Sequence, residues 1–228
     1  KAGMGLETAD AFRIKYTRPE ELGLRTEDLA SIDAIVEEGI REKAYPGAQV
    51  YIAKEGKVIY HKSFGNPTYE SSETVKESDL YDIASVTKIT STLLALMDLE
   101  GQGKLSLDDN LGKHLKMTKG TPYENLVLRD ILAHQAGLAA WIPFYNKTVS
   151  KGQPKEEFYS KDSSSVYSTR VTANLFIKPS YEDTIFYRIL NRAEVKTKKE
   201  YKYSDVGYYF MKEIVEKITK QPIDEYNA

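Results

Sequence analysis

A serine and a lysine three positions apart begin a predicted helix. Ser85 and Lys88 are followed, from Ile89 to Leu99, by residues that are mostly apolar or good helix formers, and Gly101 can end the helix. Residues three apart share a helix face, so the hydroxyl and the ammonium can point into one cleft. This pair predicts nucleophilic catalysis by Ser85, because an apolar cleft lowers the pKa of a lysine and lets the neutral amine act as a base.

The same pair also has a purely structural interpretation. Serine is a favoured first residue of helices, and Ser-x-x-Lys arises by chance about once in a chain of this length. The residues after Lys88 favour catalysis, since a solvated lysine is usually followed by polar residues on its own face. Lys88 is instead followed by Ile89 and, one turn later, Thr92. The pattern predicts a buried helix that carries this lysine.

A second candidate pair is Tyr203 and Asp205. A serine activated by lysine usually has another polar partner that relays its proton, and Tyr203 lies in a predicted turn directly before a helix over residues 207–220. Tyr123 and Tyr181 stand in similar Tyr-x-acid or Tyr-x-amide patterns, so this motif is weak by itself. A half-buried tyrosine with a satisfied hydroxyl is the structural alternative.

Composition excludes several classes of function. The chain has 228 residues, 41% hydrophobic and 29% charged, which is enough to bury a core, and a formal net charge of -2 leaves no basic surface for nucleic acid or anionic membrane. There is no cysteine, so disulfides, thiolate zinc sites and cysteine nucleophiles are excluded. No apolar run approaches the length of a membrane span, and the three histidines are too far apart in the sequence to predict a metal site.

The length of the chain is most simply explained by one domain or most of one. Residues 1–26 lack periodicity and are predicted to be a linker or an N-terminal arm, and residues 27–228 are predicted to form the domain. The predicted elements are a helix over 27–42, a hairpin of strands 48–54 and 57–64, the Ser85 helix, a short helix over 126–133 and a helix over 207–220.

Aromatic residues are interleaved with polar runs between residues 141 and 199. This pattern fits either the lining of a binding cleft or ordinary packing under long loops. The residues concerned are Trp141, Phe144, Tyr145, Phe158, Tyr159, Tyr167, Tyr181, Phe186 and Tyr187.

Taken together, three motifs resemble the serine β-lactamase and penicillin-binding-protein superfamily, and most closely its branch of class C β-lactamases, D-aminopeptidases and esterases. Ser85-x-x-Lys88 matches the nucleophile motif. Residues 132–138, Leu-Ala-His-Gln-Ala-Gly-Leu, are similar to a segment usually written Leu-Thr-His-Thr-Ser-Gly-Leu, and residues 203–208 are similar to the Tyr-x-Asn motif with its following helix. The similarity runs from about residue 20 to the C-terminus, and three matches in order are far more specific than one.

The resemblance implies an α+β chain with a β-lactamase/DD-peptidase-like fold, in which a helical subdomain packs on an antiparallel sheet and the active site lies between them. Ser85 would attack an amide or ester carbonyl of a D-amino-acid peptide, a small ester or a β-lactam, and Lys88 and Tyr203 would manage its proton. The backbone N–H of Ser85 would form half of an oxyanion hole, Asp205 would contact substrate, and no metal or cofactor would be needed. A periplasmic or extracellular location is favoured.

Two departures from the family pattern bear on activity. Asp205 replaces the family's asparagine, and a carboxylate near Lys88 should favour the charged form of the lysine and oppose its use as a base. The chain also ends before the C-terminal strands and the third motif, Lys-Thr-Gly or His-x-Gly, which would leave the hairpin over 48–64 with an open edge. We therefore expect the chain alone to be a poor catalyst, or a missing C-terminal segment to be supplied elsewhere.

Two other functions stay open. The first is a non-catalytic module that keeps the cleft to bind cell-wall peptide or a sugar-bearing partner. The resemblance suggests that such a module would be fused to a glycoside hydrolase in a longer protein. The second is a Ser/His/Asp hydrolase that uses His61, His114 or His134, although no Gly-x-Ser-x-Gly elbow surrounds a serine.

Overall fold

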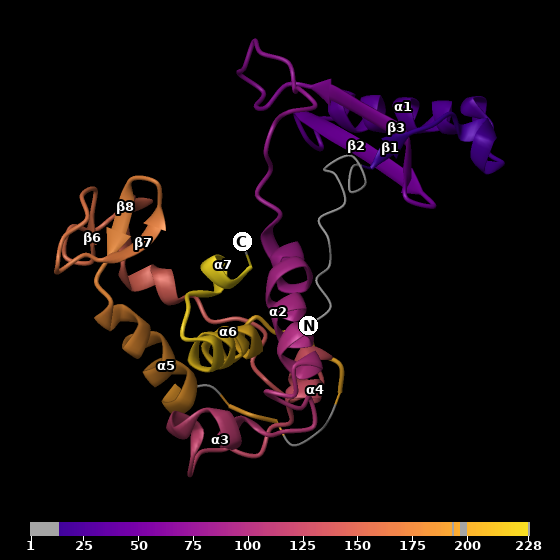
Figure 1. Ribbon diagram of the computed structural model, residues 1–228. Coiled ribbons are helices and arrows are strands. Elements are labelled where there is room, and N and C mark those ends of the chain that lie inside the picture. The colour runs from indigo at the N-terminus through magenta and orange to yellow at the C-terminus, as the bar shows by residue number, and fades with distance from the viewer. Residues whose placement is uncertain (1–13, 193, 197–199, 228) are drawn as a thin grey trace. The chain divides into compact units, whose positions relative to one another are not determined.

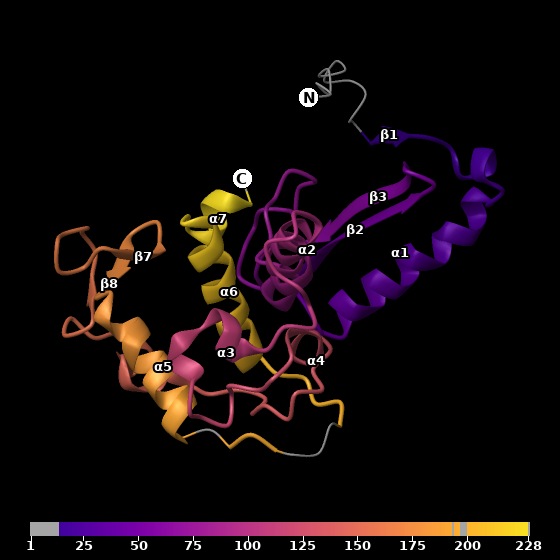
Figure 2. The ribbon, with the colours of Figure 1, turned by 60° about the horizontal axis from the view of Figure 1, so that its bottom comes forward.

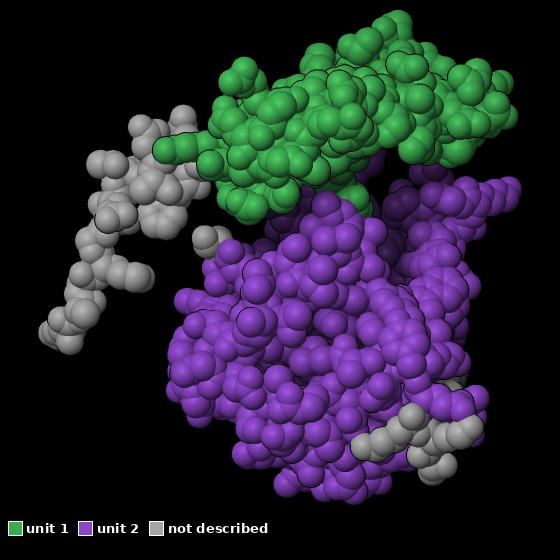
Figure 3. Space-filling view, turned by 90° about the vertical axis from the view of Figure 1, so that its right-hand side faces the viewer, with its two compact units in different colours: residues 1–82 green, residues 83–228 purple. Residues whose placement is uncertain are grey.

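The computed structural model describes residues 14–192, 194–196 and 200–227, which belong to two compact units (Figure 3). The first unit comprises residues 1–82 and the second residues 83–228. Half of the predicted linker or arm, residues 1–13, lies outside the described residues. The domain boundary after residue 26 therefore stays a prediction.

The first unit is a three-stranded sheet with one long helix. Its elements are β1 (Lys15–Tyr16), a 3-10 turn (Pro19–Leu22), α1 (Thr26–Arg41), β2 (Gly47–Lys54) and β3 (Lys57–Gly65), with strand order β1-β3-β2. β2 and β3 are antiparallel and β1 is parallel to β3. Glu55 and Gly56 both have positive φ, at 50° and 71°, the combination that a two-residue hairpin turn requires. The predicted helix and hairpin are confirmed.

A buried strand face holds α1 on this sheet. Val58 and Tyr60 of β3 are buried, as is Val36 of α1. Asp33 of α1 accepts hydrogen bonds from the Tyr60 hydroxyl and from Lys62 Nζ, the latter at 2.6 Å. These two donors, Lys62 first, lower the pKa of the Asp33 carboxyl. The amphipathic helix therefore docks through both apolar and charged contacts.

The second unit contains most of the helices. These are α2 (Leu93–Gly101), α3 (Leu111–His114), α4 (Leu128–Leu132), α5 (Ser180–Arg192), α6 (Val206–Thr219) and α7 (Ile223–Tyr226), with 3-10 turns at Lys116–Thr118 and Phe144–Lys147. α6 lies between α2 and α5 in both ribbon views (Figures 1 and 2). It buries Val206, Phe210 and Ile214, which recur every four residues and so form one apolar stripe. The predicted helix over 207–220 is confirmed as this central helix.

Residues 149–192 form short strands and a helix that the sequence did not predict. The strands are β4 (Val149–Ser150), β5 (Gln153–Pro154), β6 (Tyr159–Ser160), β7 (Thr169–Thr172) and β8 (Leu175–Ile177), paired as β4-β5 and β6-β8-β7. The sequence reasoning missed α5, because its apolar residues are mixed with tyrosines and charges. Its start signals were present: Pro179 precedes it, and Glu182 and Asp183 lie in its first turn.

The helix after Ser85 differs from its prediction in two ways. It begins with a 3-10 turn (Ala84–Val86) and a π turn (Lys88–Thr92) before α2. It is also buried on one side only, since Leu96 and Leu99 have no exposed surface whereas Leu94 and Met97 are about half exposed. The prediction of a buried helix is wrong, because an all-apolar composition does not say which side is covered.

Replacing Gly207 by alanine is expected to destabilise the second unit. A Cβ at Gly207 would lie 2.4 Å from Ile131 Cγ2, so α6 could not keep its approach to the buried Ile131 of α4. Overpacking of this kind costs about 1–3 kcal/mol of unfolding free energy. Thermal unfolding followed by circular dichroism should show a lower Tm. Gly101→Ala is the control, because nothing lies within 4 Å of a Cβ there, and an equal Tm for both variants would contradict the prediction.

Candidate active site

Ser85 and Lys88 meet at the start of the helical run that leads into α2. Lys88 Nζ donates a hydrogen bond to Ser85 Oγ at 3.1 Å, so the predicted contact between hydroxyl and ammonium is confirmed. Ser85 is exposed, while only 16% of the Lys88 side chain is exposed. Ala84, directly before the serine, has a φ of +43°, a conformation that a residue with a Cβ rarely adopts. Such backbone strain and a π turn are both frequent at functional sites.

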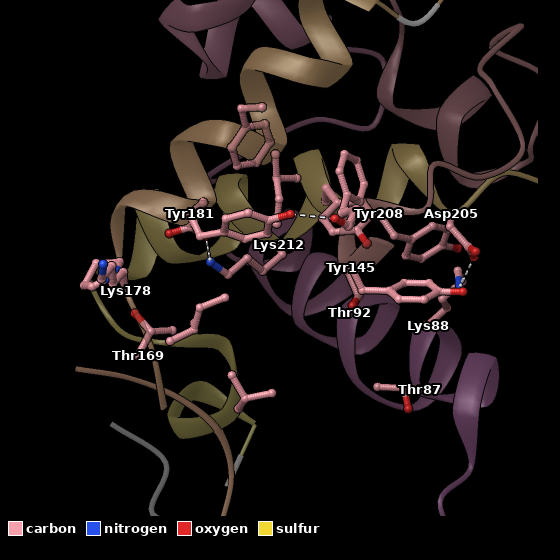
Figure 4. Close-up of a pocket in the computed structure, with 18 of the residues that line it drawn as sticks. Thr87, Lys88, Thr92, Tyr145, Thr169, Lys178, Tyr181, Asp205, Tyr208 and Lys212 are labelled. Carbon is pink, nitrogen blue, oxygen red and sulfur yellow. Dashed lines mark hydrogen bonds and ion pairs between the residues drawn. The ribbon is translucent and has the colours of Figure 1, made fainter. Parts of the chain in front are cut away.

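Asp205 approaches the same lysine from the start of α6. Lys88 Nζ lies 2.7 Å from Asp205 Oδ1, an ion pair drawn in Figure 4. Among the described residues, this buried oxygen has no hydrogen-bond partner of good geometry, so the ammonium is the group that compensates its charge. Asp205 is also not used to cap α6 by a side-chain hydrogen bond. Its carboxylate therefore acts on Lys88.

This ion pair favours the charged form of Lys88. Burial by itself would lower the pKa of Lys88, but the Asp205 carboxylate and the Tyr203 hydroxyl outweigh that effect and raise the pKa above its ordinary value. The lowered pKa predicted from the apolar context is therefore wrong. The opposing expectation, that a carboxylate at position 205 favours the charged lysine, is confirmed.

Tyr203 stands beside these groups, as its position before α6 predicts. Lys88 Nζ lies 5.4 Å from the ring centroid of Tyr203 and at the same distance from that of Tyr208. Burial raises the pKa of Tyr208, with the charge of Lys88 acting in the opposite direction. The structure thus brings all four predicted site residues to one place. Tyr208, which ends the motif over residues 203–208 but was not predicted as a site residue, is a further neighbour.

The segment before α6 is held by His134. The backbone N–H of Ser204 donates to His134 Nδ1 at 3.1 Å, and the backbone N–H of Lys202 donates to the His134 carbonyl at 2.8 Å. The backbone N–H of Asp205 donates to the Ala140 carbonyl at 2.8 Å. Because Nδ1 accepts a hydrogen bond, the ring must be neutral, and burial followed by the charge of Lys88 lowers the pKa of His134 accordingly.

We expect His134→Ala to slow any reaction at Ser85, because the loop that carries Tyr203 and Asp205 would lose its anchor. His134→Asn is the matched variant, since asparagine keeps an acceptor and tolerates the φ of +57° at this position. Covalent labelling of Ser85 should fall about tenfold or more in His134→Ala and recover largely in His134→Asn. Equal losses in both variants would show that the imidazole itself is needed.

A cavity of about 740 Å³ opens beside Ser85, Lys88 and Asp205 (Figure 4). Its other walls come from the Phe144–Lys147 turn, the β6-β8-β7 sheet, α5 and α6. Of the nine aromatic candidates, those that line it are Phe144, Tyr145, Tyr159, Tyr181 and Phe186. These five residues line the cavity, and Phe144 and Phe186 also belong to the buried core, so cleft lining and packing both apply. No sequence pattern separates the five from the other aromatic candidates.

The remaining histidines lie in other surroundings. His114 Nε2 lies 2.9 Å from Asp109, and His61 Nδ1 lies 2.9 Å from the Tyr16 hydroxyl. Neither contact involves Ser85, and the His134 contacts above do not involve it either. No group of three or more histidines and acids that could hold a metal ion occurs within the described residues. In the same part of the chain, no helix is long and apolar enough to span a membrane.

Known proteins share the sequence pattern of this chain. The model of the family described as Beta-lactamase matches residues 32–227. An "N-acetylmuramyl-L-alanine amidase" of Bacillus subtilis (strain 168) is 28% identical over 225 residues, which cover 93% of this chain and 46% of that protein. The chain therefore spans about half the length of the curated relatives it matches.

Solved structures give the same architecture. The octameric penicillin-binding protein homologue from Pyrococcus abyssi has a TM-score of 0.64 at 25% identity, covering 88% of this chain and 41% of that one. A class C beta lactamase from Rhodobacter sphaeroides has a TM-score of 0.60 at 20% identity, covering 86% and 46%. The predicted α+β fold class is confirmed by these likenesses.

Proposed function

Because this chain belongs to the Beta-lactamase family, we propose that it carries the nucleophile of a serine hydrolase that forms an acyl-enzyme on an amide or ester. The observation that supports this most is the contact of Lys88 Nζ with Ser85 Oγ at 3.1 Å, beside a large cavity. The amidase named among the relatives is consistent with an amide substrate. D-amino-acid peptides, small esters and β-lactams are the substrate classes to test.

The proposed reaction has two halves. Ser85 Oγ attacks the carbonyl carbon and forms the new C–O bond, while its proton passes to the neutral amine of Lys88, either directly or through the Tyr203 hydroxyl, which gives up its own proton as it accepts one. The C–N or C–O bond to the leaving group then breaks, and the leaving group takes up that proton. Water attacks the acyl-enzyme, which releases the acid and restores Ser85. The backbone N–H of Ser85 would stabilise the oxyanion in both halves.

The ion pair adds a condition to this scheme. Lys88 must lose its proton before it can accept one from Ser85, and Asp205 opposes that loss. Acylation should therefore be slow at neutral pH and accelerate as the pH rises. The role of Asp205 in contacting substrate is also proposed here, since its carboxylate lines the cavity.

Covalent labelling tests the proposal. The protein is incubated separately with a fluorophosphonate and with a penicillin, and intact mass followed by peptide mapping locates any adduct. We expect one adduct on Ser85 and none on Ser91, a serine of the same helical run. Protein unfolded in denaturant should give no adduct, because the lysine contact is then lost. An adduct distributed over several serines, or equal labelling of folded and unfolded protein, would contradict the proposal.

The charged state of Lys88 favours a second candidate function. A lysine held by a carboxylate suits a non-catalytic module that retains the cavity for binding peptide or sugar-bearing ligands. This alternative predicts equal affinity for a D-alanyl peptide in the natural protein and in Ser85→Ala, with no acyl-enzyme in either.

A further inference from the structure

The walls of the cavity beside Ser85 are mainly apolar and aromatic. Tyr145 lies on the Phe144–Lys147 turn, Val171 on β7, Ile177 on β8 and Tyr181 on α5, so four separate elements contribute to one surface. Tyr208 and Tyr209 of α6 add two more rings. Apolar and aromatic lining with a few polar groups at one end is the usual composition of a site for a small organic ligand.

The charges on the wall are largely compensated within the protein. Lys88 pairs with Asp205 at 2.7 Å, and Lys212 pairs with Glu182 at 2.6 Å. Lys178 lies 5.4 Å from the ring centroid of Tyr167. The cavity therefore offers a ligand more apolar contact than free charge, apart from the groups next to Ser85.

The size of the cavity adds a second constraint. Pockets that hold ligands of drug size measure about 300–1,000 Å³, and this cavity of about 740 Å³ lies inside that range. The methyl side chain of an alanyl group would leave most of this volume empty. A group with one or two rings would cover the tyrosine faces and remove more apolar surface from water.

We propose that the substrate of Ser85 carries a bulky apolar group, preferably aromatic, that occupies this cavity next to the reacting carbonyl. The inference rests on the proposed serine hydrolase function and adds the substrate class. Esters and amides of aromatic or long-chain acids are favoured over those of small acids such as acetate or alanine.

Labelling rates test the inference. Fluorophosphonates with a methyl, a hexyl and a naphthyl group are compared by the second-order rate constant for the Ser85 adduct, each divided by the rate of hydrolysis of the same reagent by hydroxide. Ser85 Oγ forms a bond to phosphorus, fluoride leaves, and the serine proton passes to the neutral amine of Lys88 and from there to solvent. We expect the corrected rate to rise roughly 10–100-fold from methyl to naphthyl.

Two valines of similar exposure give a matched pair of variants. Val171, 50% exposed, lines the cavity, whereas Val166, 54% exposed, does not. Val171→Trp should fill part of the cavity and reduce the naphthyl-to-methyl ratio severalfold, while Val166→Trp should keep the ratio of the natural protein. A ratio near one in the natural protein, or an equal reduction by both substitutions, would overturn the inference.

A binding experiment separates this inference from the proposed function. Binding of 2-acetylnaphthalene to Ser85→Ala is measured through the fluorescence of the ligand, with Val171→Trp added as a second substitution. Weaker binding after this substitution supports the aromatic cavity, whether or not Ser85 is labelled. Absence of labelling would count only against Ser85 as the nucleophile. If Ser85 is labelled at a rate that does not depend on reagent size, and 2-acetylnaphthalene does not bind, the inference about the cavity is overturned while the proposed hydrolase function stands.

Discussion

Lys88→Met is expected to slow labelling of Ser85 by a fluorophosphonate about 10²–10⁴-fold at pH 8, the range usually contributed by a positioned general base. Methionine has a similar length and fits the same space, but it can neither accept the serine proton nor donate to Ser85 Oγ, 3.1 Å from Lys88 Nζ. The measurement is the rate of adduct formation by intact mass, with circular dichroism to show that the variant is folded.

The controls for Lys88→Met separate a lost base from a lost charge. Lys178→Met removes another lysine of the same cavity and should change the rate less than about threefold. Lys88→Met also leaves the Asp205 carboxylate without its partner, which can destabilise the site. The double variant Lys88→Met/Asp205→Asn removes both charges and should remain as slow as the single variant. Recovery of the rate in the double variant would contradict a role of Lys88 as base.

Asp205→Asn is expected to speed the same reaction. The carboxylate raises the pKa of Lys88, so its replacement by a neutral amide should lower that pKa. At any pH below both values, the fraction of neutral amine then increases about tenfold for each unit. The pH at which labelling is half-maximal should therefore move toward lower pH, and labelling at pH 7 should be faster than in the natural protein.

Glu182→Gln is the matched control for this variant. Glu182 lines the same cavity and pairs with a lysine, but that lysine is Lys212. Its neutralisation should leave the pH profile of Ser85 labelling in place. If Asp205→Asn leaves the profile unchanged or moves it toward higher pH, the carboxylate does not control the charge of Lys88, and another group must set the pH dependence.

Much of the fold could be predicted because its signals are local. The hairpin follows from two β-rich runs across Glu55 and Gly56, and α6 follows from its four-residue apolar repeat. The missed helix α5 is not explained by absent local signals. Its residues Ile185, Phe186, Ile189 and Leu190 recur at helical spacing and are buried or half-buried, but the tyrosines and charges around them favoured the interpretation of an irregular region.

The candidate site was also predictable only in part. The contact of Ser85 with Lys88 was predicted because three residues of helix bring two side chains together regardless of the rest of the chain. The motif at Tyr203 and Asp205 was chosen for its position directly before a helix and was then supported by the family resemblance. Its opposition to a neutral Lys88 was expected from the charge of a carboxylate. Which effect on the pKa of Lys88 is stronger, burial or ion pairing, depends on distances that no spacing in the sequence contains.

The sequence by itself determined the nucleophile motif, the family to which the chain belongs, the hairpin and the central helix. The tertiary structure alone decided that Lys88 is held in its charged form, that His134 anchors the segment before α6, and that five of nine aromatic candidates line one cavity. The physical reason is that helix and turn preferences act over a few neighbouring residues. Burial and ion pairing arise only when segments far apart in the chain pack together.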